Sequence, residues 1–186
     1  MDSRISLLTP TRTAAILGLG SGFMIIMAAV FEYGFGLHPC TMCYWQRIPH
    51  WLVIGLSVLC VAPILAVRIP LAVKISGRDF GRYMVMLMAA ALLAGAAIAF
   101  WHAGVELKLL PGPTACSGGI SLDGDASALL DQLLAAPVVR CDEVPWSLFG
   151  ISMAGWNGLI SFAMMMVAVM SVIASQPNTG KSNPTA

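Results

Sequence analysis

The sequence predicts an all-α membrane protein: a four-transmembrane-helix bundle with a long outer loop that carries a short amphipathic helix. Hydrophobic residues make up 58% of the 186-residue chain and charged residues only 10%, against about 25% charged in ordinary globular domains. The mean hydropathy is +0.83. Because this length holds about four spans of roughly 20 residues with short connections, residues 1–186 are expected to form a single membrane domain.

The first two predicted spans cover residues 13–31 and 44–67, and a short loop over 32–43 joins them. The first apolar run is longer than the core of a typical signal peptide, about 7–15 residues, so we interpret it as a membrane helix. Gly18 and Gly22 form a small-xxx-small pair. Such pairs permit close contact with a neighbouring helix.

The third and fourth predicted spans cover residues 83–101 and 146–174. A polar loop over 68–82 precedes the third span, and the longest polar stretch, 102–145, precedes the fourth. Pro145 is expected to open the fourth span, because proline is favoured in the first turn of a helix.

Within the long loop, leucines between residues 125 and 136 fall on one helical face, and Pro137 follows as a stop signal. A short helix of this kind could lie flat on the bilayer with its leucines in lipid, or it could pack on the top of the bundle. The leucines are Leu129, Leu130, Leu133 and Leu134.

The distribution of lysine and arginine predicts the orientation. With four spans, both termini lie on the same side as the loop 68–82, and that side holds seven of the ten basic residues. Cytoplasmic connections are enriched in basic residues, so the termini are expected in the cytoplasm. The loops 32–43 and 102–145 then place four of the five cysteines on the oxidising outer side. Cys60 lies within the second span and is expected to be a packing residue.

Two pairs of cysteines on the outer side are candidates for redox chemistry. Cys40 and Cys43 form a Cys-x-x-Cys pair, and Arg47 follows four residues later on the same helical face. A nearby cation or a helix N-terminus lowers the pKa of a thiol, which favours thiol–disulfide exchange. Cys116 and Cys141 lie 25 residues apart in the long loop, and a bridge between them would order that loop. Glycines around Cys116 leave it accessible to another protein's thiolate.

The residues alone allow three interpretations of these cysteines. They could form structural disulfides, the usual fate of extracytoplasmic cysteines. They could bind zinc, although zinc sites favour two tight Cys-x-x-Cys pairs and the second pair here is widely spaced. They could form a redox relay, because a Cys-x-x-Cys disulfide is short and often labile.

The order of the motifs resembles the bacterial disulfide-bond formation protein B (DsbB) family. Cys40-Thr-Met-Cys43-Tyr-Trp-Gln-Arg47 matches the Cys-x-x-Cys-x-x-x-Arg signature of that family. His102-Ala-Gly-Val-Glu-Leu, the segment Pro111-Gly-Pro-Thr-Ala-Cys116, the distant Cys141 and the four spans extend the resemblance over nearly the whole chain.

The resemblance implies a quinone-dependent oxidoreductase that generates protein disulfides at the bacterial inner membrane, with its redox loops in the periplasm. Cys116 would be attacked by a reduced periplasmic DsbA-like protein, and Cys141 would then pass electrons to Cys40. Cys43 would be the thiolate that meets ubiquinone or menaquinone, and Arg47 would hydrogen-bond a quinone oxygen.

By the same resemblance His102 sits near the quinone; as a simpler alternative, it is an interfacial histidine with no special task. Gln46 stands where some members of the family carry an acid, which weakens any proton-transfer role there. No metal is expected, and no basic run suggests nucleic acid.

Two alternatives to this function compete with it. One is a non-catalytic membrane scaffold with two structural disulfides. The other is a reductase like vitamin K epoxide reductase, in which the Cys-x-x-Cys follows the loop cysteines.

Overall fold

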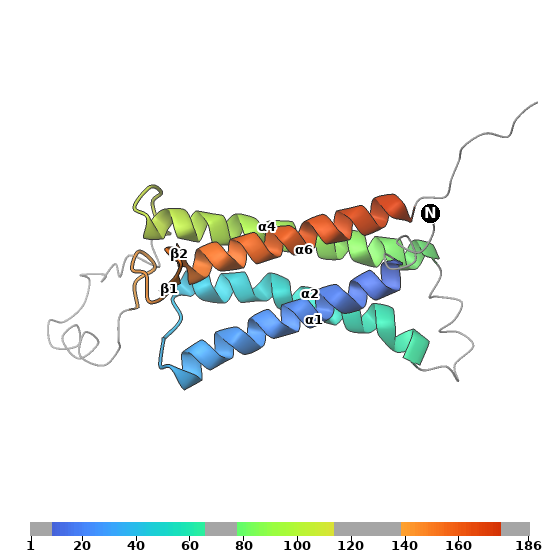
Figure 1. Ribbon diagram of the computed structural model, residues 1–186, viewed down its shortest axis with the longest axis horizontal. Coiled ribbons are helices and arrows are strands. Elements are labelled where there is room, and N and C mark those ends of the chain that lie inside the picture. The colour runs from blue at the N-terminus through green and yellow to red at the C-terminus, as the bar shows by residue number, and fades with distance from the viewer. Residues whose placement is uncertain (1–8, 66–77, 114–138, 176–186) are drawn as a thin grey trace, which may run out of the picture.

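Four long helices lie side by side along the length of an elongated bundle (Figure 1). The structure is a computed structural model that describes residues 9–65, 78–113 and 139–175. The helices are α1 (Pro10–Ala29), α2 (Thr41–Leu65), α4 (Arg78–Glu106) and α6 (Met153–Ala174). A π-helical turn, η2 (Val30–Gly34), continues α1, and an antiparallel hairpin of β1 (Ser147–Leu148) and β2 (Ile151–Ser152) precedes α6.

Three helical segments in the described part of the chain are long and apolar enough to cross a membrane: Pro10–Gly34, Asp79–Glu106 and Met153–Ala174. They confirm the prediction of a helical membrane protein. Helix α2 overlaps the predicted span 44–67 but is not among the three, and its first turns carry the polar side chains of Gln46, Arg47 and His50. A fourth span therefore stays a prediction.

The helix ends at the cysteine-bearing side differ from those predicted. Helix α4 runs five residues beyond 101, to Glu106, because His102 and Glu106 find polar partners inside the bundle. Helix α6 begins at Met153 rather than at 146, so Pro145 does not open it. The hairpin takes up residues 147–152, and the Ser152 side chain caps α6 by accepting a hydrogen bond from the Gly155 backbone N–H at 3.1 Å.

Two features of the sequence lie outside the described residues: the predicted short helix over 125–136, and Cys116. Most of the predicted loop 68–82 also lies outside the described residues. The end of the bundle where Cys40 precedes α2, α4 ends and α6 begins is called the cysteine end below; in Figure 1 it is the end with the hairpin.

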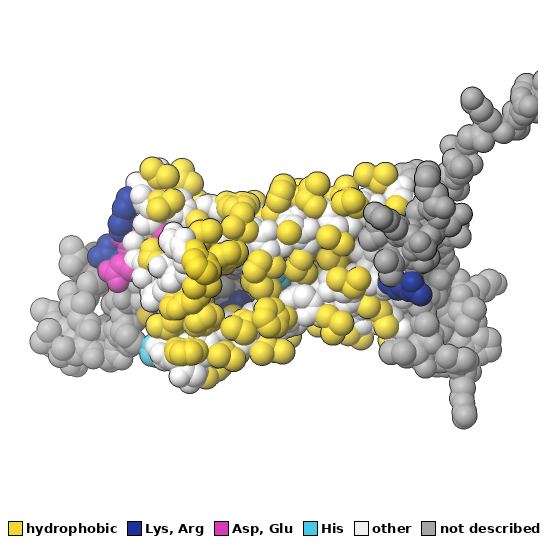
Figure 2. Space-filling view, viewed as in Figure 1, with side chains coloured by type: hydrophobic (Ala, Val, Ile, Leu, Met, Phe, Trp, Pro, Cys, Tyr) yellow, Lys and Arg dark blue, Asp and Glu magenta, His cyan; other side chains and the backbone are white. Residues whose placement is uncertain are grey.

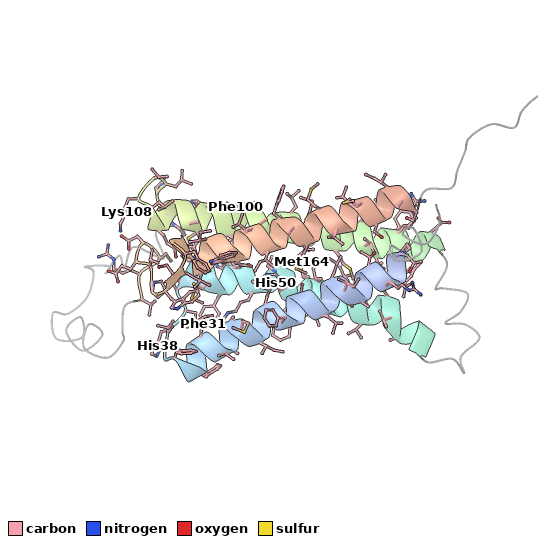
Figure 3. The ribbon with its side chains drawn as sticks, in the orientation of Figure 1. Phe31, His38, His50, Phe100, Lys108 and Met164 are labelled. Carbon is pink, nitrogen blue, oxygen red and sulfur yellow. The ribbon has the colours of Figure 1, made fainter. Side chains whose placement is uncertain are left out.

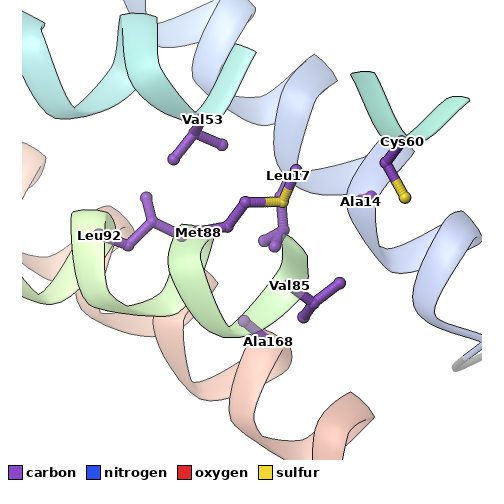
Figure 4. Packing of buried hydrophobic residues seen from close by; sticks show 8 residues of the cluster. All are labelled: Ala14, Leu17, Val53, Cys60, Val85, Met88, Leu92 and Ala168. Carbon is purple, nitrogen blue, oxygen red and sulfur yellow. The ribbon is translucent and has the colours of Figure 1, made fainter. Parts of the chain in front are cut away.

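The apolar core fills the bundle away from the cysteine end. Side chains from all four helices meet there (Figure 4). Cys60 is one of them and is a free thiol, as expected for a packing residue. The core residues are Ala14, Leu17, Val53, Cys60, Val85, Met88, Leu92 and Ala168.

Small residues bring the helices together at two contacts with α2. A methyl group added at Gly18 of α1 would overlap the side chain of Ser57 in α2, whose Cβ is fixed to the backbone. A methyl group at Gly95 of α4 would lie 3.1 Å from Cβ of Pro49. Gly22 has open space around it, so only one member of the predicted small-xxx-small pair makes a close contact.

We expect Gly18→Ala to lower the free energy of unfolding by about 1–3 kcal/mol, since overpacking a close contact forces the backbones apart. Gly22→Ala is the matched control, because it adds the same methyl group to the same helix where nothing lies within 4 Å. Thermal unfolding of the purified protein in detergent measures both. Equal stability of the two variants would contradict the close α1–α2 contact.

Candidate redox site

The Cys-x-x-Cys pair sits at the N-terminus of α2. Cys40 directly precedes the first helical residue, Thr41. The Cys43 backbone N–H, which no helical carbonyl can reach this early in the helix, points at Cys40 Sγ at 3.4 Å. The two sulfur atoms are 3.0 Å apart, and both cysteines are free thiols. The helix start therefore presents one backbone N–H group to the sulfur of the first cysteine of the motif.

The surroundings of Cys40 favour the thiolate form of its side chain. A hydrogen bond from the Cys43 thiol lowers the pKa of Cys40 from 9.0 to about 4, against the opposing effect of burial. His102 adds to the lowering, because its Nε2 lies 3.5 Å from Cys40 Sγ. A thiolate is the nucleophilic and the leaving form of cysteine. Cys40 is thus prepared for exchange at neutral pH.

Cys141, which belongs to the second predicted cysteine pair, lies next to Cys40. Cys141 is fully buried and disulfide-bonded, and its bonding partner lies outside the described residues. Its sulfur, the Cys40 sulfur and a ring nitrogen of His102 all lie within 4.8 Å of one another. Zinc binds cysteine as the thiolate, and Cys141 is committed to a disulfide, so this group does not match a zinc site. The arrangement suits exchange between a thiolate and a neighbouring disulfide.

Ion pairs hold the segment of Cys141 against the end of α4. The Lys108 ammonium donates to the Asp142 backbone carbonyl at 2.8 Å and contacts the Asp142 carboxylate. Arg140 donates to the same carboxylate through Nε and Nη2, each at 2.9 Å. Arg140 and then Lys108 hold the pKa of Asp142 below its ordinary range. These contacts fix the backbone on both sides of Cys141.

A cavity of about 280 Å³ opens beside Cys43. It brings together the three residues expected to contact a cofactor, Cys43, Arg47 and His102. The rest of its wall is mainly apolar, and Figure 2 shows a hollow in the apolar surface near the cysteine end with a basic side chain inside it. Apolar wall residues include Phe23, Met24, Phe31, Trp146, Trp156 and Ile160.

Arg47 is held at this cavity by a partner that the sequence did not suggest. Its Nη1 donates to Glu32 Oε2 at 2.6 Å, and its guanidinium lies 5.1 Å from the centre of the Tyr44 ring. Glu32, assigned from sequence to a loop, lies in the π-helical turn η2. The aromatic wall beside it is formed by Phe31 and Trp146, whose ring centres are 4.9 Å apart. Phe31 is labelled in Figure 3.

Sequence reasoning missed four polar residues that line the same cavity: His38, His50, Glu106 and Asn157. His50 follows Cys43 by seven residues and so shares its helical face, which was the available signal. Asn157 is a lone amide in an apolar run, and in membrane helices such residues usually hydrogen-bond across helices. Glu106 Oε1 lies 4.0 Å from His102 Nε2, and its other oxygen accepts from the Ser152 hydroxyl.

A helical membrane protein that buries a dithiol next to a disulfide at one end of its bundle is built for thiol–disulfide exchange. The family model "Disulfide bond formation protein DsbB" matches residues 10–171. This chain therefore belongs to the DsbB family, whose members are membrane proteins of disulfide-bond formation.

Curated relatives agree with this assignment. The disulfide bond formation protein B of Stutzerimonas stutzeri is 31% identical over 90% of this chain and 97% of its own length. The protein of the same name from Saccharophagus degradans is 30% identical over 85% of this chain and 90% of its own length. The protein of the same name from Chromohalobacter salexigens is 31% identical over 88% of this chain and 90% of its own length. No solved structure gives a significant match.

We expect the Cys40 thiolate to survive acidification. Because the pKa of Cys40 is lowered to about 4, the thiolate is present at all higher pH values and is lost only as the pH falls through about 4. The ultraviolet thiolate absorbance of protein with Cys40 and Cys43 reduced, titrated from pH 10 down to pH 3, measures this.

The Cys40→Ser variant provides the baseline for that titration, and Cys60→Ser the control. A thiolate signal that disappears between pH 9 and pH 7 would contradict the environment described for Cys40.

Proposed function

We propose that this chain is a quinone-dependent thiol oxidase of the bacterial inner membrane that reoxidises a periplasmic DsbA-like dithiol protein. Membership of the DsbB family supports the disulfide-forming activity. The observation that carries the rest is the position of the Cys-x-x-Cys pair: Cys40 faces the disulfide-bonded Cys141, and Cys43 faces a largely apolar cavity. Electrons entering at one side of the pair can leave at the other.

The cavity suits the head group of ubiquinone or menaquinone. Apolar and aromatic walls fit a flat ring, and Arg47 and His102 offer polar contacts for its oxygens. A bound quinone would accept two electrons and two protons and leave as the quinol. In this proposal Arg47 would hydrogen-bond a quinone oxygen while keeping its ion pair with Glu32, and Cys43 would be the electron donor.

The first exchange begins outside the described residues, at Cys116. A thiolate of the reduced partner attacks Cys116 in a Cys116–Cys141 disulfide, which forms a mixed disulfide and releases Cys141 as a thiolate. The second thiolate of the partner then attacks its own bridged sulfur. The partner leaves with a disulfide, and Cys116 and Cys141 hold the two electrons.

The second exchange passes these electrons to the first pair. The Cys141 thiolate attacks Cys40 in a Cys40–Cys43 disulfide and releases Cys43 as a thiolate. Cys116 then attacks Cys141, re-forms the loop disulfide and releases Cys40. The lowered pKa of Cys40 makes it a good leaving group, and the short distance between its sulfur and that of Cys141 supports direct transfer.

The proposed topology puts the cysteine pairs on the periplasmic side, where the relay requires them. With α2 as a fourth span, seven of ten basic residues lie on the side of the termini, which favours cytoplasmic termini and periplasmic redox loops. The short amphipathic helix over 125–136 would then rest on the periplasmic side. A scaffold with two structural disulfides is less well supported, because it gives no role to the cavity beside Cys43 or to the short distance between the Cys40 and Cys141 sulfurs. Membership of the DsbB family argues against the vitamin K epoxide reductase alternative.

We expect Cys43→Ser to abolish quinone reduction while the protein stays folded, because the sulfur beside the cavity is the proposed electron donor. Quinone absorbance, followed in purified protein after addition of a reduced DsbA-like partner, measures the activity. Cys60→Ser is the matched control, since that thiol lies in the apolar core. Normal turnover by Cys43→Ser would refute the proposed function.

Loss of the Arg47 guanidinium is expected to raise the KM for quinone at least about tenfold and to leave the KM for the partner protein unchanged, because one charge-assisted hydrogen bond is lost. The variant tested is Arg47→Gln combined with Glu32→Gln, which avoids an unpaired carboxylate. Glu32→Gln alone is the control. Steady-state titration of each substrate separates the effects, and equal increases in both KM values would argue against a quinone contact.

A further inference from the structure

A chain of buried and half-buried polar side chains crosses the bundle near the cysteine end and joins all four helices. It runs from His102 in α4 through Gln46 in α2 and Asn157 in α6 to His50 in α2 and Ser21 in α1. Figure 3 shows His50 between the helices, farther from the cysteine end than Phe31. The relay proposed above uses His102 as a neighbour of Cys40 and as a polar contact for the quinone, and leaves the other four without a role.

Every link of this chain is within hydrogen-bond distance. Gln46 Nε2 lies 2.7 Å from His102 Nδ1, and Asn157 Nδ2 donates to Gln46 Oε1 at 2.6 Å. His50 Nε2 lies 3.0 Å from Asn157 Oδ1, and His50 Nδ1 lies 3.3 Å from Ser21 Oγ. Ser161 also donates to Asn157 Oδ1, at 3.2 Å.

The two amides give the chain a direction. An amide can only donate from its nitrogen and accept at its oxygen. Because Gln46 Oε1 accepts from Asn157, the Gln46 nitrogen faces His102 Nδ1 and donates to it. His102 Nδ1 must then present its lone pair. A neutral His102 therefore carries its proton on Nε2, the nitrogen that faces Cys40 Sγ.

The same logic fixes the far histidine. Asn157 donates through its nitrogen to Gln46, so its oxygen is turned to His50 and Ser161 and accepts from both. His50 consequently carries its proton on Nε2, and its Nδ1 accepts from the Ser21 hydroxyl. Both histidines hold the same tautomer for one reason, the orientation of the two amides between them.

Reversing the chain would change the chemistry at Cys40. If both amides turned over, His102 would carry its proton on Nδ1 and would point a lone pair at the Cys40 sulfur. A lone pair favours the thiol there, whereas an N–H favours the thiolate. The observed direction agrees with the other acceptors around the ring: Glu106 Oε1 lies 4.0 Å from Nε2, and the Cys141 backbone is hydrogen-bonded to His102.

We propose that Asn157 and Gln46 are positioning residues that hold the His102 proton on Nε2, directed at the Cys40 sulfur, with His50 and Ser21 anchoring the far end of the chain. The use of the resulting thiolate in electron transfer rests on the proposed function. The tautomer itself depends on neither quinone nor partner protein, so it can be tested alone.

Nitrogen-15 NMR of histidine-labelled protein distinguishes protonated from unprotonated ring nitrogens and tests the proposal directly. In the unsubstituted protein with Cys40 and Cys43 reduced, His102 is expected to show a protonated Nε2 and an unprotonated Nδ1. In Asn157→Leu, which contacts neither His102 nor Cys40, the Gln46 amide loses its orienting donor. The Nδ1-protonated form of His102 is then expected to appear.

The thiolate titration of Cys40 provides a second readout. The ionisable groups that face this sulfur are Cys43, His102 and Glu106, and all three remain in the variant. Loss of a fixed N–H donor in Asn157→Leu is expected to move the titration midpoint upward by about one pH unit. Ser161→Ala is the matched control, because it removes a hydrogen bond to the same amide oxygen without changing the direction of the chain.

Three results would overturn the proposal: a proton on His102 Nδ1 in the unsubstituted protein, an unchanged tautomer in Asn157→Leu, or a thiolate midpoint that moves as far in Ser161→Ala. Should Asn157→Leu fail to fold, Gln46→Met removes the donor to Nδ1 and is expected to give the same two changes. An inactive protein with the expected tautomer would refute the quinone relay and leave the positioning role standing.

Discussion

The need to pair every polar group inside an apolar bundle shapes the functional end of this protein. A buried amide, imidazole or carboxylate without a partner costs free energy, and lipid offers no water in exchange. Seven side chains from four helices therefore satisfy one another between Cys40 and Ser21. In the described part of the chain, only Arg82 Nε, near the other end of α4, is a buried side-chain nitrogen or oxygen that lacks a hydrogen-bond partner.

The two sulfurs of the Cys-x-x-Cys motif have different surroundings. Cys40 lies before the helix, against the Cys43 backbone N–H and His102, and close to the disulfide-bonded Cys141. Cys43 lies within the first turn and lines the cavity. Although the sulfurs are only 3.0 Å apart, Cys40 faces the disulfide-bonded Cys141 and Cys43 faces a mainly apolar cavity.

Much of the site could be predicted from local spacing. Cys43 and Arg47, four residues apart on one helical face, line the same cavity, and so does His102, which the resemblance singled out. Spacing within a helix is fixed by its geometry, so such predictions need no knowledge of the fold. Glu32 could not be found in this way. Its ion pair with Arg47 depends on η2, which continues α1 beyond the residue where a loop was expected.

The sequence by itself determined the class of protein and the apolar helices, because composition and helical periodicity are properties of neighbouring residues. The tertiary structure decided which distant polar groups meet. Asn157 donates to Gln46 across 111 positions of the chain, and His50 faces Asn157 across 107. Only packing of α6 against the other helices sets these partners. The direction of a hydrogen-bonded chain follows from the packed arrangement of its donors and acceptors, and no local pattern in the sequence encodes it.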